Sequence, residues 1–279
     1  MALFRQVTIL GLGLIGGSLG MAIRRRRLAR KVVGWSRKSS TLRLARKRGA
    51  IDQGFTNLAQ AVAGADLVVL ATPVDRIVPL ARQAARAMAR GSILTDVGST
   101  KARVVRELAR ILPRTIHFVG GHPLAGSEQR GIQAARPALF DGSVCVLTRT
   151  PHTSSRALAQ VRRLWAPLVY EVIVLDPIKH DTLLAEASHL PHALAFSLAA
   201  SVSREASALA PRSLADMTRI AGSDPGLWDD IFLSNDRSLL RAMDRFDSEW
   251  KKLRHALVKR NGSALHRLLR DSQRRRAMM

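Results

Sequence analysis

The stretch that decides the fold is Gly11-Leu12-Gly13-Leu14-Ile15-Gly16, which directly follows the apolar run Val7-Thr8-Ile9-Leu10. Three glycines at this spacing, between a buried strand and a helix, are typical of a dinucleotide-binding turn. Gly11 permits the tight bend, Gly13 lets the backbone approach a pyrophosphate, and Gly16 lets the helix pack closely on the strand. The helix that opens at Leu14 and Ile15 directs unpaired N–H groups at the phosphates. The sequence therefore predicts a dinucleotide site at residues 11–16.

Short apolar runs alternate with helical patterns over the first part of the chain. The candidate strands are residues 6–10, 31–35, 66–71, 92–96, 117–119, 143–147 and 171–174. Helical patterns between them include residues 14–26, 40–48 and 76–90. Most of the strand candidates are continuously apolar, as strands covered by helices on both faces should be. This alternation predicts a parallel, doubly wound sheet with right-handed crossovers.

The alternation stops after Asp176-Pro177, and only helical patterns follow. They cover residues 179–208, 213–221, 225–234, 236–260 and 263–276. We therefore expect an α/β protein with an N-terminal Rossmann-type doubly wound parallel sheet over residues 1–176. An all-α domain is expected over residues 177–279.

The end of the second strand bears on the choice of cofactor. NAD sites usually place a carboxylate there, about 20 residues after the glycines, to bind the ribose 2′-hydroxyl. This chain has Ser36, Arg37 and Lys38 there, and its first carboxylate is Asp52. A hydroxyl and two cations suit a 2′-phosphate, so we expect NADP to be preferred, with NAD left possible. The strand ends at Ala71-Thr72-Pro73 and at Gly98 are expected to form the walls around the nicotinamide and its ribose.

A second segment, Gly120–Glu128, suggests the chemistry. It reads Gly-Gly-His-Pro-Leu-Ala-Gly-Ser-Glu and places His122 in a turn bounded by glycine and proline. Neutral histidine is a suitable base for removing a hydroxyl proton during an alcohol oxidation. Ser99, at another strand end, is positioned to hydrogen-bond the same hydroxyl, and Glu128 to orient or gate the site. The alternative is that His122 only caps or packs the turn.

Bulk composition narrows the function classes. The 279 residues carry a formal net charge of +24, but the arginines are spread over many helical segments and aromatic residues make up only 4%. This pattern argues against nucleic-acid binding as the main role. The lone Cys145 lies in an apolar run and is expected to be a buried thiol. The apolar run 183–200 contains a glutamate and two histidines, which indicates a buried helix rather than a membrane span. No targeting signal is evident, so a cytoplasmic location is expected.

Five segments in order resemble the prephenate/arogenate (cyclohexadienyl) dehydrogenases of tyrosine biosynthesis. They are residues 11–18 (GLGLIGGS), 96–101 (DVGSTK), 120–128 (GGHPLAGSE), 188–192 (SHLPH) and 218–228 (TRIAGSDPGLW). The resemblance implies an oxidoreductase that oxidises a cyclohexadienol carrying a ring carboxylate para to its hydroxyl. Hydride passes to the nicotinamide, the carboxylate leaves as carbon dioxide, and the ring becomes aromatic. It also implies a homodimer formed through the helical domain.

The resemblance further implies roles for individual residues. His122 would accept the hydroxyl proton, with Ser99 bonding that hydroxyl. Arg219 would hold a substrate carboxylate, which suits the planar guanidinium. His192 would line the substrate pocket, with His180 and His189 nearby. The residues that resemble a polar gate around this pocket are Glu128, Asp216 and Trp228.

Some alternatives remain open on the sequence alone. His189 and His192 are three residues apart, a spacing that can bind a metal, but no cysteine or carboxylate cluster joins them and no metal is expected. Residues 210–216 read Ala-Pro-Arg-Ser-Leu-Ala-Asp, where many relatives have a glycine-rich stretch, which leaves arogenate versus prephenate undecided. The Ser36-Arg37-Lys38 pattern resembles NADP-using arogenate enzymes and favours arogenate. The rival functions are a 3-hydroxyacid or imine reductase and a non-catalytic dinucleotide sensor that binds DNA.

Overall fold

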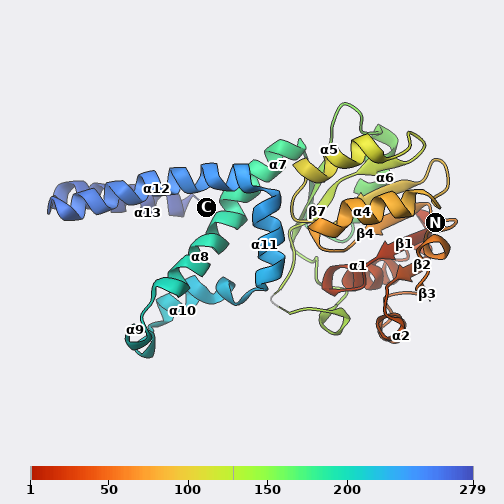
Figure 1. Cartoon of the computed structure of the whole chain (residues 1–279), viewed down its shortest axis with the longest axis horizontal. Coiled ribbons are helices and arrows are strands. Elements are labelled where there is room, and N and C mark those ends of the chain that lie inside the picture. Colours follow the sequence, from red (N-terminus) through yellow and green to blue (C-terminus); the bar gives the residue numbers. More distant parts are fainter. Residues whose placement is uncertain (1, 128, 279) are drawn as a thin grey trace.

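The computed structural model describes residues 2–127 and 129–278, which form a sheet-containing part and a helical part (Figure 1). The main sheet has six parallel strands in the order β3-β2-β1-β4-β5-β6. These strands are β1 (Phe4–Leu10), β2 (Ala29–Trp35), β3 (Gln53–Phe55), β4 (Leu67–Leu70), β5 (Ile93–Asp96) and β6 (His117–Val119). This order is that of a doubly wound dinucleotide-binding sheet, and it confirms the predicted fold class.

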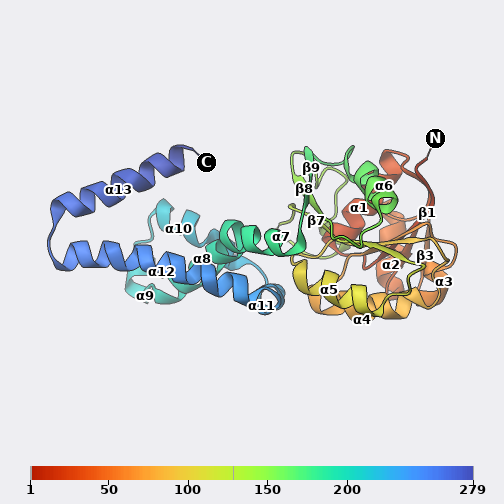
Figure 2. The same cartoon turned by 90° about the horizontal axis from the view of Figure 1, so that it is seen from above.

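Helices cover both faces of this sheet because its strands are apolar on both sides. Along β4, Leu67 and Val69 belong to one buried cluster, whereas Val68 and Leu70 belong to the other. Successive side chains of a strand point to opposite faces, so a continuously apolar run requires a cover on each. The helices are α1 (Leu14–Arg25), α2 (Ser39–Lys47), α3 (Leu58–Val62), α4 (Val74–Ala85), α5 (Ala102–Ile111) and α6 (Ser155–Trp165). Figure 2 shows α4 and α5 on one face and α1 and α6 on the other.

The last strands form a separate sheet, which differs from the prediction of one parallel sheet. β7 (Gly121–Pro123), β8 (Val144–Thr148) and β9 (Glu171–Leu175) pair in that order, with β7 antiparallel and β9 parallel to β8. His122 therefore lies in a short strand rather than in a turn, and it faces Val146 in the register. β3 was not predicted, because its three residues carry no apolar run; in the structure Gln53 is exposed and the other two residues are half-buried. Cys145 is buried in β8, as predicted.

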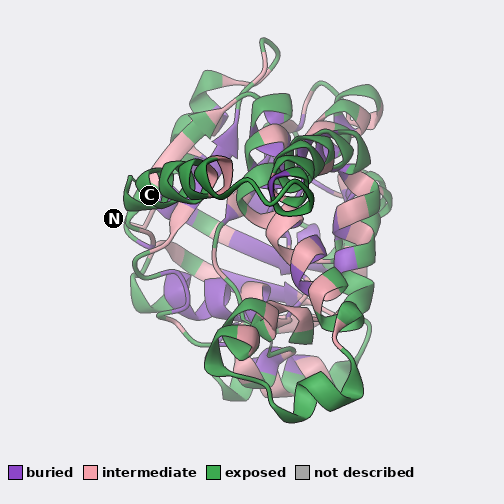
Figure 3. Cartoon of the chain, turned by 90° about the vertical axis from the view of Figure 1, so that its left-hand side faces the viewer, coloured by how far each residue is buried: buried purple, intermediate pink, exposed green. Residues whose placement is uncertain are grey.

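The helical part follows β9. It contains α7 (Pro177–Leu184), a π-helical turn (Ala185–His189), α8 (Leu190–Ser201), α9 (Arg204–Ala208), α10 (Arg212–Thr218), a 3-10 turn (Arg219–Gly222), α11 (Pro225–Ser234), α12 (Asp236–Val258) and α13 (Gly262–Ala277). The single helix predicted for residues 179–208 is thus divided into several. Viewed along the long axis, α12 and α13 are largely exposed in front of the buried strands (Figure 3). Over residues 2–127 and 129–278, no helix is both long enough and apolar enough to cross a membrane.

Candidate active site

The glycine turn between β1 and α1 has the geometry that a dinucleotide needs. Gly11 has a φ of +101°, and a side chain there would collide with the carbonyl oxygen of Ala71 at the end of β4. A side chain on Gly16 would collide with the carbonyl oxygen of Gly11, whereas the space around Gly13 is open to 4 Å. The first and third glycines are therefore required by the fold. The second leaves an open face at the start of α1.

Two further observations fit a phosphate ligand at this turn. Gly13 is the N-cap residue of α1 and supplies no side-chain cap, so the first N–H groups of the helix lack a side-chain acceptor. The buried hydroxyl of Thr72, on the neighbouring strand end, has no hydrogen-bond partner within the described part of the chain. Unpaired donors around an open helix N-terminus form an anion site, and the residues present fit a dinucleotide.

The end of β2 is basic, as predicted. Arg37 and Lys38 are exposed, and the Lys38 N–H donates to the Ser36 hydroxyl oxygen over 3.3 Å. Asp52 is engaged elsewhere: one of its oxygens accepts from the Val32 N–H and the other from Arg24. The first carboxylate of the chain is thus committed to a structural role. Ser36, Arg37 and Lys38 surround the place where a ribose 2′-substituent would lie.

A buried carboxylate, Asp96, connects several segments at the carboxyl-end edge of the sheet, the edge that also carries the glycine turn. The side chains of Asp96 and Lys101 are fully buried and form an ion pair. Asp96 also accepts hydrogen bonds from the N–H groups of Gly98, at 2.9 Å, and Gly121, at 3.1 Å. The turn that carries Ser99 is thereby held against the strand that carries His122. Ser99 itself is half-buried on this turn.

His122 is connected to the helical part by a chain of side chains. Its Nδ1 lies 2.9 Å from Nε2 of His180, and His180 Nδ1 lies 2.7 Å from Oδ1 of Asp181. The Asp181 carboxylate also accepts from the N–H groups of Lys101 and Ala102, which open α5, at 2.7 and 2.8 Å. His180 and Asp181 are on α7, so this chain joins the two parts of the molecule.

The Asp181 carboxylate determines the histidine tautomers. Since a carboxylate accepts only, His180 donates to it from Nδ1 and presents Nε2 as an acceptor. His122 must then donate from Nδ1, which leaves its Nε2 with a free lone pair. Burial lowers the pKa of His122 well below its ordinary value, and the neighbouring His180 and then the Lys101 cation act in the same direction. His122 is therefore neutral at physiological pH and can accept a proton at Nε2.

The other predicted histidines lie around Trp228 on α11. His192 stacks on the indole with ring centroids 3.6 Å apart, and His189 meets it edge-on at 6.2 Å. His189 is buried and bonds to the Asn235 amide at 3.2 Å, while the same amide donates to the Asp181 carbonyl oxygen at 2.7 Å. Burial lowers the pKa of His189 to about 4. Trp228 is thus a buried residue that supports the two histidines, and the predicted gate at Trp228 stays a prediction.

The π-helical turn helps to place these histidines. Pro191 lacks the N–H that would continue the helical ladder, and the turn Ala185–His189 ends two residues before it. The extra residue rotates the following helix, and His192 donates from Nδ1 to the Ser188 carbonyl oxygen at 2.9 Å. Burial lowers the pKa of His192, and the neighbouring Arg219 cation lowers it further. His189 and His192 therefore have different hydrogen-bond partners, although both rings contact Trp228.

Most of the predicted substrate residues are brought together. His122, His180, His189 and His192 form a connected series through Asp181, Asn235 and Trp228, and Arg219 lies close enough to influence His192. The Asp216 side chain is 71% exposed on α10, and its ion-pair partner is Arg212 at 4.0 Å. Glu128 lies outside the described residues.

Comparison with known proteins identifies the family. The family model described as "Prephenate dehydrogenase, nucleotide-binding domain" matches residues 19–174. A second model, "Prephenate dehydrogenase, dimerization domain", matches residues 176–271. The chain belongs to the prephenate dehydrogenase family.

Curated relatives and solved structures agree with this assignment. The chain is 34% identical to the cyclohexadienyl dehydrogenase of Zymomonas mobilis, over 99% of this chain and 96% of that protein. A structure of the A. aeolicus prephenate dehydrogenase in complex with hydroxyphenyl propionate and NAD+ is 31% identical, with a TM-score of 0.90 over 98% of each chain. The Synechocystis arogenate dehydrogenase structure is 30% identical, with a TM-score of 0.85 over 98% of this chain and 99% of that one. These similarities indicate an oxidoreductase.

Sequence reasoning missed four residues of this site. Asp96 and Lys101 lie within the quoted DVGSTK segment, whose polar ends follow an apolar strand, and this signal could have identified them. Asp181 directly follows His180, but only the fold shows that its carboxylate meets the start of α5. No pattern around Asn235 in the sequence indicates its role, because that role depends on hydrogen bonds to Asp181 and His189, which are about fifty positions away.

The buried ion pair can be tested by its effect on stability. Replacing Lys101 with Met leaves the Asp96 carboxylate buried without a counter-charge, and is expected to lower the free energy of unfolding by about 3–5 kcal/mol. The matched control is Arg103→Met, which breaks the exposed pair with Glu107 and should cost at most about 1 kcal/mol. Urea unfolding followed by circular dichroism measures both. Equal, small losses would contradict the structural role of the pair.

Proposed function

We propose that this chain oxidatively decarboxylates arogenate, prephenate or both, with NADP as the preferred cofactor. The observation that carries the proposal is the series His122–His180–Asp181, which leaves an unprotonated Nε2 beside the strand ends of a dinucleotide-binding sheet. Membership of the prephenate dehydrogenase family supports the same reaction class. Residues 1–176 would hold the cofactor, and residues 177–279 would complete the substrate pocket and form the dimer.

His122 is the base in this proposal. Its Nε2 takes the proton of the substrate hydroxyl while the bound nicotinamide supplies the hydride acceptor. The ring carboxylate leaves as carbon dioxide, and its bonding electron pair completes the aromatic ring. His180 and Asp181 act as positioning residues, because they hold the His122 ring in one tautomer and stabilise the imidazolium that forms. The Ser99 hydroxyl, held near by Asp96, bonds the reacting hydroxyl.

In this proposal, a cationic side chain of the helical part binds a carboxylate of the substrate. Arg219 opens the 3-10 turn after α10, is exposed, and lies near His192. A guanidinium binds a planar carboxylate through two parallel hydrogen bonds, which suits one end of a dicarboxylate substrate. We assign Arg219 to a substrate carboxylate and His192, with His189 and Trp228 behind it, to the pocket wall. Glu128 and Asp216 remain candidates for the gate and for discrimination of the ammonium of arogenate.

A homodimer through the helical part completes the proposal. The family model matched by residues 176–271 describes a dimerization domain. The helices α12 and α13 leave large apolar side chains in water, among them Trp250 at 55%, Leu257 at 57% and Leu269 at 56% exposure. Apolar groups exposed along a helix pair are typical of a surface that a second chain covers.

Initial rates on a grid of two substrates and two cofactors test the activity. Purified protein is given arogenate or prephenate, each with NADP or NAD, and the appearance of the reduced nicotinamide is followed. Turnover with at least one substrate, and faster with NADP than with NAD, is expected. Absence of turnover in all four combinations by protein that still binds NADP would contradict the proposed reaction.

The cofactor assignment makes a separate prediction. In Arg37→Ser and in Lys38→Ser, the KM for NADP should rise about tenfold or more, because a charge-assisted contact to the 2′-phosphate is lost. The KM for NAD, which has no such phosphate, should stay within about twofold, as should both values in the control Arg43→Ser on the exposed face of α2. An unchanged KM for NADP in both variants would exclude this basic turn as the phosphate site.

The base can be tested by rate and by pH dependence. His122→Asn should lower kcat by about 10²–10⁴-fold while NADP binding is retained, whereas the exposed His152→Asn should have no effect. The base works only when neutral, and the lowered pKa of His122 keeps it neutral until the pH falls well below its ordinary value of 6.5. The acidic limb of kcat/KM should therefore have its midpoint below pH 6.5. A midpoint above 7, or normal turnover by His122→Asn, would exclude His122 as the base.

A further inference from the structure

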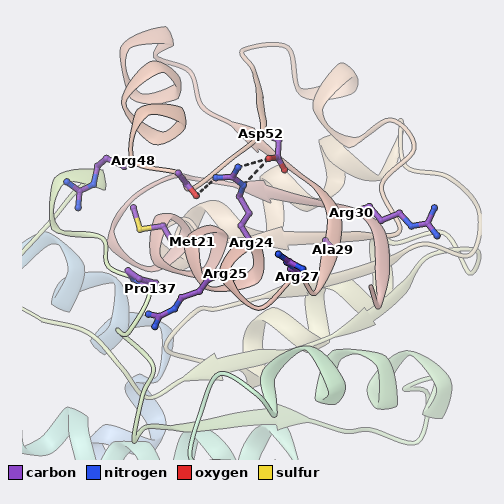
Figure 4. A pocket seen from close by; sticks show the side chains of 10 residues that line it. Met21, Arg24, Arg25, Arg27, Ala29, Arg30, Arg48, Asp52 and Pro137 are labelled. Atoms are coloured by element: carbon purple, nitrogen blue, oxygen red, sulfur yellow. Dashed lines mark hydrogen bonds and ion pairs between the residues drawn. The ribbon is translucent and has the colours of Figure 1, made fainter. Parts of the chain in front are cut away.

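A surface cavity of about 570 Å³ lies away from the active site, and five arginines line it: Arg24, Arg25, Arg27, Arg30 and Arg48 (Figure 4). They come from the C-terminal ends of α1 and α2 and from the start of β2. The remaining walls include Met21, Ala29 and Pro137. The catalytic residues and the proposed 2′-phosphate site lie at the opposite, carboxyl ends of the strands. Arg30 and Arg37 are separated by the length of β2, which is about 20 Å.

The cavity carries a large uncompensated positive charge. Asp52 is its only carboxylate, and that group is already taken by Arg24 at 2.9 Å and by the Val32 N–H at 2.7 Å. Arg48 donates to the carbonyl oxygen of Ala135 at 2.8 Å and keeps its charge. Among the residues that the structure describes, no carboxylate pairs with Arg25, Arg27 or Arg30. Cations that line one cavity repel one another, and an anion bound among them would relieve that repulsion.

Helix capping does not account for these arginines. The last carbonyl groups of α1 are satisfied by the backbone: the Leu28 N–H donates to the Ile23 oxygen, and the Arg27 N–H to the Arg24 oxygen. In this arrangement the residue at the Arg27 position adopts a left-handed conformation and is usually glycine. Arg27 has a φ of +53°, a conformation that is strained for a residue with a side chain, and its guanidinium lines the cavity.

We propose that this cavity is a second anion site that binds a compact polyphosphate, either inorganic or the triphosphate of a nucleotide. Guanidinium groups bind phosphate oxygens in pairs, and a chain of linked phosphates matches several arginines within one concave site. The volume is that of a small-molecule site. Pro137, which lines the cavity, belongs to the segment that connects β7 to β8, so a bound anion would lie against the loop that follows the His122 strand.

Calorimetric titration with tripolyphosphate tests the site directly. The full-length protein is kept saturated with NADP throughout, so that the glycine turn and the basic end of β2 are occupied. One tripolyphosphate is expected to bind per chain. In Arg25→Gln and in Arg27→Gly, the affinity should fall about tenfold or more, because each loses a charge-assisted contact. A parallel titration with ATP distinguishes the sources: equal affinity indicates the phosphate chain alone, and tighter binding indicates that the nucleoside adds contacts.

Arg260→Gly is the matched control. Arg260 ends α12 in the same way, with a φ of +48° and the same pair of backbone hydrogen bonds, but it lies outside the cavity. Because glycine adopts this conformation without strain, both glycine variants should melt at or above the temperature of the unchanged protein. Only Arg27→Gly should lose tripolyphosphate affinity.

Three results would overturn the proposal. One is the absence of binding to the NADP-saturated protein, which would assign any anion affinity to the cofactor site. Another is an equal loss of affinity in Arg27→Gly and Arg260→Gly, which would indicate attraction by the net charge of +24 as a whole. The third is a duplex oligonucleotide that binds far more tightly than tripolyphosphate and is unaffected by either cavity variant, which would indicate an extended nucleic-acid surface.

Discussion

The site depends on the requirement that a buried carboxylate be fully satisfied. Asp96 ends β5 with no exposure to water, where an unpaired charge would cost several kcal/mol. It is satisfied by Lys101 and by the N–H groups of Gly98 and Gly121. Gly98 lies in the turn after β5, Lys101 precedes the first residue of α5, and Gly121 is the first residue of β7. The hydrogen bonds and the ion pair of the Asp96 carboxylate therefore bring the Ser99 turn and the His122 strand together.

A second carboxylate extends this arrangement to the helical part. Asp181 accepts from the first N–H groups of α5 and from His180, so α7 is attached to the sheet by the same group that orients the histidines. The proposed base and the junction between the two parts therefore share one hydrogen-bond network. A change in how α7 meets α5 would alter the hydrogen bonds that hold the His122 ring.

Patterns among neighbouring residues were sufficient to predict much of the fold from the sequence. Glycine spacing and apolar runs predicted the turn at Gly11 and five of the six strands of the main parallel sheet, because those patterns reflect burial on two faces. They also assigned β8 and β9 to that sheet, whereas both belong to the second one. They failed where pairing between distant segments decides the structure. β7 has three residues and no apolar run, and its strand conformation arises only from pairing with β8. The division of the predicted long helix was missed as well, although Pro191, which lacks the N–H of a regular helix, was a local signal for it.

The sequence by itself determined the cofactor turn, the basic residues after β2 and the histidine in the GGHPLAGSE segment, because each is a property of neighbouring residues. Only the tertiary structure decided that Asp181 holds His180 against His122, that Trp228 supports His189 and His192, and that five arginines from three elements share a cavity. The physical reason is that charge compensation and tautomer choice act between atoms a few ångströms apart. Those atoms belong to residues that can lie more than fifty positions apart along the chain, as His122 and His180 do.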